Sequence, residues 1–186
     1  MPDEIVVLVH GASGAGKVPG IEQIAGQVDL RFAADDRTTR AAIADVEVLF
    51  GWDFRARILR EIWPLATRLK WVQWSGAGVD AVLFPEFVAS DVVLTNVRGV
   101  FDRAMAEYTL GLILATAKLL PETWRLQTSS AWQHRLTTRV RGQQVLVIGV
   151  GSIGREIARM LAAIGLRTSG VGRTHRAQDV DFDTVY

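Results

Sequence analysis

The stretch Val145-Leu146-Val147-Ile148-Gly149-Val150-Gly151-Ser152-Ile153-Gly154 decides the fold of this chain. Its first four residues are branched and apolar, as in a buried strand, and three glycines follow directly. Residues 153, 157, 161 and 164 are then isoleucine or leucine, which is the spacing of one helix face. A strand, a Gly-x-Gly-x-x-Gly turn and a helix in this order predict a dinucleotide-binding turn.

Each glycine of this turn has a physical task. Gly149 permits the tight turn, Gly151 lets a pyrophosphate approach the backbone, and Gly154 lets the helix pack close to the strand. The unpaired N–H groups at the start of the helix then face the phosphates, and Arg155 in the first turn adds a positive charge. The alternative is a glycine-rich turn of an unrelated α/β protein. The predicted cofactor contacts in this turn are Gly149, Gly151, Ser152, Ile153, Gly154 and Arg155.

The end of the next predicted strand selects the cofactor. A carboxylate there accepts a hydrogen bond from the ribose 2′-OH, whereas an arginine accommodates a 2′-phosphate. The sequence at this point is Gly172-Arg173-Thr174-His175-Arg176, with no carboxylate before Asp179. We therefore predict NADP(H) in preference to NAD(H), with Arg173 as the main 2′-phosphate partner and Thr174 and Arg176 assisting. The alternative is that these arginines are solvated loop charges.

Upstream of this turn, short apolar runs alternate with segments of helical spacing. This alternation implies a mainly parallel sheet covered on both faces. A long helical pattern over residues 101–120, ended by Pro121, suits a connection between two domains. We expect an α/β protein with one domain over residues 1–98 and a second over residues 99–186. The predicted strands are residues 4–10, 28–33, 46–50, 71–75, 92–96, 145–149 and 166–172, and the predicted shorter helices are residues 37–44, 58–69 and 152–164.

Composition and charge exclude several classes of protein. With 49% hydrophobic and 22% charged residues, the 186-residue chain is expected to pack rather than stay disordered. It has no apolar run of membrane-spanning length and no basic signal sequence, so we expect a cytoplasmic protein without a membrane span. It has no cysteine, and we predict no metal site. Residues 101–186 hold 11 basic and 7 acidic side chains, an excess too small for nucleic acid but suited to a small phosphorylated ligand.

Three segments in order resemble the D-isomer-specific 2-hydroxyacid dehydrogenases: Leu69-Lys70-Trp71-Val72-Gln73-Trp74-Ser75-Gly76-Ala77-Gly78-Val79-Asp80, then Met105-Ala106-Glu107-Tyr108, then the glycine turn. The likeness is greatest to the glyoxylate/hydroxypyruvate reductase branch and most specific between residues 69 and 176. It implies a flavodoxin-like N-terminal domain that closes over a Rossmann NAD(P)-binding domain, with a small 2-oxoacid substrate between them. It also implies hydride transfer from NADPH and a homodimer formed through the nucleotide domain.

The resemblance assigns further site residues. It implies that the backbone N–H groups of Gly76, Ala77 and Gly78 hold the substrate carboxylate. The residues agree, because a Ser-Gly-Ala-Gly loop after a strand exposes its amides without side-chain obstruction. Trp52 is expected either to wall the substrate pocket or to serve in ordinary packing. The resemblance adds Met105 to the cofactor contacts.

The resemblance stops before the catalytic residues. The family's catalytic Arg, Glu and His are expected beyond Tyr186, and His10, His134 and His175 are expected to be structural or surface residues. We count two of the six strands of a complete dinucleotide fold. The expectation is a C-terminally truncated chain that is inactive alone, binds NADPH weakly and exposes an unpaired strand edge.

Two other functions are open alternatives. The first is a non-catalytic nucleotide-binding module that keeps the fold without the chemistry. The second is a P-loop NTPase, because residues 11–17 read Gly-Ala-Ser-Gly-Ala-Gly-Lys after a predicted strand. However, Val18 stands where a hydroxyl would bind Mg²⁺, and Pro19 removes an N–H where the phosphate-binding helix should begin. We therefore predict a flexible loop there.

Overall fold

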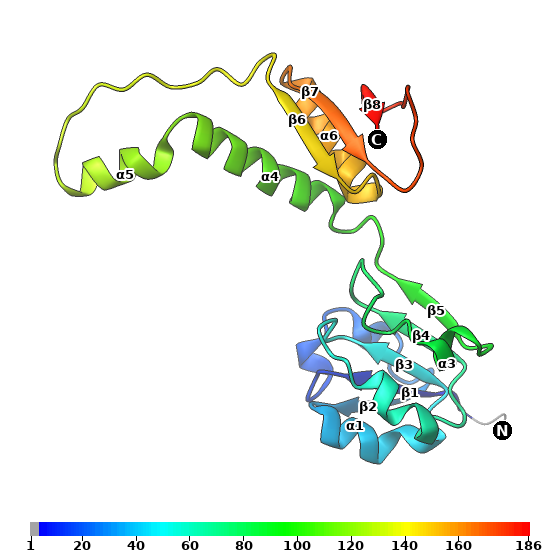
Figure 1. Ribbon diagram of the computed structural model, residues 1–186. Helices are drawn as coiled ribbons and strands as arrows, with labels where there is room; N and C mark the ends of the chain where they lie inside the picture. The colour runs from blue at the N-terminus through cyan, green and yellow to red at the C-terminus, as the bar shows by residue number, and fades with distance from the viewer. Residues whose placement is uncertain (1–3) are drawn as a thin grey trace. The chain divides into compact units, whose positions relative to one another are not determined.

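The structure, a computed structural model, describes residues 4–186 and divides into two compact units, Met1–Arg98 and Gly99–Tyr186 (Figure 1). Each unit has its own parallel sheet. Among the described residues, no helix is long and apolar enough to cross a membrane.

The first unit is built on a five-stranded sheet in the order β2-β1-β3-β4-β5, with every neighbouring pair parallel. This is the order of the flavodoxin-like fold that the family resemblance implies. The strand order changes direction between β1 and β3, because β2 is added on one side of β1 and the later strands on the other. In such sheets the crevice outside the carboxyl ends of the strands at this reversal is the usual ligand site. The strands are β1 (Val6–His10), β2 (Asp29–Ala33), β3 (Val48–Gly51), β4 (Trp71–Trp74) and β5 (Val93–Asn96).

Three short helices accompany this sheet: α1 (Asp36–Ala42), α2 (Leu59–Ile62) and α3 (Pro85–Val88). Asp35 caps α1 by accepting a 2.8 Å hydrogen bond from the Thr38 N–H. The helix predicted over residues 58–69 is much shorter in the structure and continues as a 3₁₀ turn, Trp63–Leu65. The reason is Pro64, which has no N–H to donate to the preceding helical turn.

The sheet of the first unit separates two hydrophobic clusters. Adjacent residues of β1 point into different clusters, with Leu8 in one and Val9 in the other. Both side chains are fully buried, so the strand is covered on both faces, as its uninterrupted apolar sequence predicts.

The second unit has a three-stranded parallel sheet in the order β6-β7-β8. The strand–helix–strand run predicted around the glycine turn is confirmed, but the structure adds a third strand that the sequence did not reveal. This strand has only two residues, too few to show a pattern. The elements are α4 (Asp102–Ala117), α5 (Leu120–Thr128), β6 (Gln144–Ile148), α6 (Ser152–Ala163), β7 (Arg167–Val171) and β8 (Thr184–Val185).

The long helix predicted over residues 101–120 is wrong at its end. Helix α4 stops at Ala117, and Leu119 adopts a left-handed conformation with φ 54° that separates it from α5. Pro121 lies in the first turn of α5, where the missing N–H would have no partner within the helix. The proline therefore begins a second helix rather than ending the first.

Helix α6 packs against the sheet of the second unit (Figure 1). Its buried residues include Gly154, Ala158 and Leu161, whereas Ile164, which was predicted on the apolar face, is 37% exposed. Ile164 is the C-cap residue, beyond the last turn of the helix, and the small residues Gly154 and Ala158 let the helix lie close to the strands.

Candidate functional site

The glycine turn joins β6 and α6 through a very close backbone approach. Gly149 has a φ of 104°, and its N–H donates to the Val171 carbonyl at 2.9 Å. A Cβ atom on Gly154 would lie 1.9 Å from the Gly149 carbonyl oxygen. Only glycine fits at position 154, because any side chain would push the helix off the strand.

The start of α6 presents unpartnered backbone donors. Gly151 is the N-cap and supplies no side-chain hydrogen bond. Within residues 4–186, the N–H groups of Ser152, Ile153 and Gly154 donate to no other group. A Cβ atom on Gly151 would meet nothing within 4 Å, so the space beside the N-cap residue is open. Free amides at a helix N-terminus with open space beside its N-cap suit an anion.

A cavity of about 520 Å³ lies beside this turn. Its lining contains two arginines and no carboxylate. Five of the predicted contacts do not line it: Met105, in the first turn of α4, and Ser152, Ile153, Gly154 and Arg155. The lining residues are Ile148, Gly149, Val150, Gly151, Val171, Gly172, Arg173, Thr174 and Arg176.

The two arginines of this cavity differ in their partners. Arg176 Nη1 lies 2.8 Å from Asp179 Oδ2. Arg173 is exposed and makes no ion pair with any residue in the described part of the chain. Its charge is therefore uncompensated at the mouth of the cavity.

Arg155 is placed differently from the sequence-based expectation of a phosphate contact. Its Nη1 atom lies 2.7 Å from both Asp179 Oδ1 and Asp181 Oδ2, and it does not line the cavity. Hydrogen bonding to Arg155 lowers the pKa of Asp179 to about 2. The charge of Arg155 is thus neutralised within the protein, which the sequence did not show because the acidic residues are 24 and 26 positions away.

The predicted carboxylate-binding loop follows β4 in the first unit. Across residues 4–186, the N–H groups of Gly76, Ala77 and Gly78 make no hydrogen bond. A carbonyl of this loop is held in place, because the Asn96 side-chain amide donates to the Ala77 carbonyl at 2.8 Å. An anchored carbonyl with neighbouring free amides is consistent with anion binding.

Trp52 follows β3, the strand beside β4. It is half-buried, packs edge-to-face on Phe50 with ring centroids 5.9 Å apart, and joins the cluster around Val9 and Val18. Packing accounts for part of its surface, and a substrate-facing role stays a prediction.

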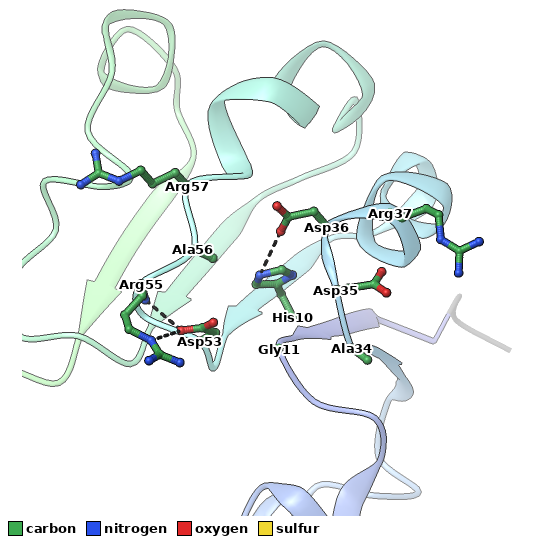
Figure 2. Close-up of a pocket in the computed structure, with 10 residues that line it drawn as sticks. All are labelled: His10, Gly11, Ala34, Asp35, Asp36, Arg37, Asp53, Arg55, Ala56 and Arg57. Atoms are coloured by element: carbon green, nitrogen blue, oxygen red, sulfur yellow. Dashed lines mark hydrogen bonds and ion pairs between the residues drawn. The ribbon is translucent and has the colours of Figure 1, made fainter.

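A second concavity, of about 650 Å³, lies at the carboxyl ends of β1, β2 and β3 (Figure 2). The imidazole of His10 lies between the carboxylates of Asp36 and Asp53, while the guanidinium groups of Arg37 and Arg57 point away from it (Figure 2). Sequence reasoning treated His10 only as a strand-end residue and missed this cluster.

The hydrogen bonds of Thr39 fix the tautomer of His10. The Thr39 hydroxyl donates to the Asp35 carbonyl at 2.9 Å, so it must accept from His10 Nδ1–H, 2.7 Å away. The neutral ring therefore carries its lone pair on Nε2, which lies 3.7 Å from Asp36 Oδ1. Burial lowers the pKa of His10 below 6.5, against the opposing effect of Asp36, Asp53 and Asp35.

The loop over residues 11–17 lacks the helix that a P-loop requires. It continues as a three-residue 3₁₀ turn, Ala15–Lys17, and the described chain reaches β2 without an intervening α-helix. Nor do residues 4–186 contain a cluster of side chains suited to a metal ion.

Comparison with known proteins gives consistent matches. Residues 110–186 match the family model "D-isomer specific 2-hydroxyacid dehydrogenase, NAD binding domain". The chain is 31% identical over 131 residues to a glyoxylate reductase of Thermococcus onnurineus, and 26% identical over 116 residues to the D-3-phosphoglycerate dehydrogenase of Sus scrofa. A solved D-isomer specific 2-hydroxyacid dehydrogenase family protein from Aeromonas salmonicida superposes with a TM-score of 0.77 at 28% identity.

These matches cover most of this chain but only part of each relative. The alignments include 66%, 61% and 97% of this chain, respectively. They include 39% of the glyoxylate reductase, 22% of the phosphoglycerate dehydrogenase and 57% of the Aeromonas chain.

Gly151 and Gly154 form a matched pair of test positions. We expect Gly154→Ala to lower the free energy of unfolding by about 1–3 kcal/mol, because its Cβ overlaps the Gly149 carbonyl. Gly151→Ala should cost less than about 1 kcal/mol, since only N-cap preference opposes it, yet weaken NADPH binding at least about tenfold. Urea unfolding and fluorescence titration measure the two effects. Wild-type affinity in Gly151→Ala would contradict phosphate approach at this residue.

The neutral His10 makes stability depend on pH. Because its folded-state pKa lies below its unfolded value, the unfolded chain binds the proton more readily, and we expect the unfolding free energy to fall as the pH drops below about 6.5. Urea unfolding at pH 7.5 and pH 5.5 measures this loss. His10→Gln should reduce the pH dependence, and His175→Gln, at an exposed position, should retain it. Equal pH dependence in all three proteins would show that His10 is not responsible.

Proposed function

Because the family match, the relatives and the solved structures all indicate the D-isomer-specific 2-hydroxyacid dehydrogenase family, we propose that this chain supplies cofactor-binding and substrate-binding parts of an NADP(H)-dependent 2-oxoacid reductase. The observation that carries the proposal is the open turn at Gly151, with three free helix amides beside a cavity that contains an unpaired arginine.

The residues of this cavity fit a dinucleotide with a 2′-phosphate. The amides at the start of α6, beside the cavity, suit the pyrophosphate. Arg173, in the lining after the end of β7, supplies a free cation. No carboxylate lines the cavity to accept from a ribose 2′-OH, and Asp179 is occupied by Arg155 and Arg176. Thr174 lines the same edge and adds a hydroxyl donor.

The proposed substrate class is supported by the loop after β4. The amides of Gly76, Ala77 and Gly78 bind and orient the substrate carboxylate, and Asn96 keeps the loop in place. When bound, NADPH supplies the hydride for reduction of the 2-oxo group. A glyoxylate or hydroxypyruvate substrate is supported by the similarity to a glyoxylate reductase.

The cofactor preference is tested with two nucleotides that differ only in the 2′-phosphate. We expect the chain to bind 2′,5′-ADP more tightly than 5′-AMP. Arg173→Gln should reduce 2′,5′-ADP affinity about tenfold, the scale of one charged hydrogen bond, and leave 5′-AMP affinity within about twofold. Arg167→Gln, at an exposed position on β7, is the charge-matched control. Equal wild-type affinity for the two nucleotides, measured by calorimetry, would contradict NADP(H) preference.

The 186 residues are proposed to lack hydride-transfer activity by themselves. The catalytic Arg, Glu and His that the resemblance implies have no assigned counterpart among them, and His10 is committed to Thr39. We expect no NADPH oxidation with glyoxylate or hydroxypyruvate, followed at 340 nm. Turnover above the buffer rate would contradict this expectation.

We further propose a homodimer formed through the second unit. Helix α4 buries only Ala106, while Met105, Tyr108 and Leu112 are 43%, 64% and 52% exposed. Trp132, in the segment after α5, is 94% exposed. A large apolar surface of this kind is typical of a protein interface.

The non-catalytic nucleotide-binding module is the second candidate, because the same free amides and cavity serve it equally well. The coding sequence of the parent gene after Tyr186 separates the two. An Arg, a Glu and a His in that order favour the enzyme.

The cytoplasmic location stays a prediction.

A further inference from the structure

Arg155 is the centre of a compact ion cluster. Its guanidinium makes three hydrogen bonds of 2.7, 2.7 and 3.0 Å to Asp179 and Asp181. The Asp179 and Asp181 side chains are only 4% and 6% exposed, and that of Arg155 is 23% exposed. Such desolvated, charge-assisted bonds have the fixed fork geometry of arginine and cannot be reproduced by lysine.

This cluster joins α6 to the segment that carries the cavity arginines. Residues 172–183 connect the parallel strands β7 and β8 without a helix. Asp179 also accepts from Arg176 Nη1 at 2.8 Å and from the Asp181 N–H at 3.1 Å. The guanidinium of Arg155 lies 5.9 Å from the ring centroid of Phe182, which is buried. The cluster therefore fixes this crossover to α6 together with the packing of Phe182 against Ala158.

Residues 172–183 are also held by the buried Phe182, which shares a core cluster with Ala158 of α6, and by a few hydrogen bonds, among them Gly172 N–H to the Tyr186 carbonyl at 2.9 Å and the Thr168 hydroxyl to the Asp181 carbonyl at 3.3 Å. Arg176 and Val185 exchange two backbone hydrogen bonds of 2.8 Å, and the Asp183 N–H donates to the Thr168 carbonyl at 2.8 Å. Between these points, the side chains of Asp179 and Asp181 provide the ion pairs to α6. Arg173 and Thr174 have no side-chain partner among residues 4–186, so their position follows from the shape of the segment.

We propose that Arg155 is a positioning residue that holds residues 172–183 in the shape that places Arg173 at the cavity beside Gly149. Its importance for recognition of a 2′-phosphate rests on the proposed NADP(H) function. Arg155 does not line the cavity, so it acts through Arg173 rather than by touching the nucleotide.

Two nucleotides separate this role from direct phosphate binding. Both 5′-AMP and 2′,5′-ADP carry the 5′-phosphate that would meet the start of α6, and only 2′,5′-ADP carries the group that Arg173 would bind. A direct contact from Arg155 to the 5′-phosphate predicts equal losses for both. Positioning through Arg173 predicts a loss for 2′,5′-ADP alone.

The experiment uses the whole 186-residue chain with Arg155→Gln, Arg155→Lys and Asp181→Asn, and with Arg167→Gln as control. We expect Arg155→Gln to weaken 2′,5′-ADP about tenfold and 5′-AMP less than about twofold. Arg155→Lys should restore little of the loss, because lysine lacks the planar fork through which the two Nη atoms of arginine meet both carboxylates. Asp181→Asn should act in the same direction, which keeps the test valid if Arg155→Gln fails to fold.

Hydrogen exchange gives a readout independent of any nucleotide. Faster amide exchange confined to residues 172–183 in the Arg155 and Asp181 variants supports the proposal, and unchanged exchange there overturns it. Equal losses for the two nucleotides, or unchanged 2′,5′-ADP affinity despite faster exchange, overturn positioning of Arg173. If the wild-type chain binds both nucleotides equally, the proposed cofactor preference fails, and the exchange data alone decide whether Arg155 holds the segment.

Discussion

The contact between Gly154 and the Gly149 carbonyl is the constraint on which the second unit depends. With no room for a Cβ atom, α6 lies directly on the end of β6, and its first amides have no hydrogen-bond partner among the described residues. The same helix buries Ala158 in one cluster with Val147 of β6 and Val185 of β8. One packing requirement therefore sets both the hydrophobic core of this unit and the donors of its candidate binding site.

Most of the fold was predictable because its signals are local. The β-branched runs predicted β1 and β6, and the glycine spacing predicted the turn before α6. The failures have local causes too. Strand β8 is too short to show a pattern, and a proline after a helical run is compatible with either the end of one helix or the start of the next.

The candidate sites were less predictable, because side-chain partners come from distant positions. Gly151 and Arg173 were predicted from their place in a motif, and the structure sets both at one cavity. Arg155 was expected at the phosphates by sequence proximity alone, but the chain folds Asp179 and Asp181 back onto it. The tautomer of His10 likewise depends on Thr39, which is 29 residues away.

The ion cluster has a consequence for the electric field around the second unit. With the neighbouring ion pairs included, the positive charges of Arg155, Arg159 and Arg176 equal in number the negative charges of Glu156, Asp179 and Asp181. The group is therefore close to neutral as a whole. Arg173 then stands as an isolated source of positive potential at the cavity mouth. Polyanions are steered toward such a point over roughly one Debye length, about 10 Å at 0.1 M ionic strength, so the rate of their capture falls as salt is added.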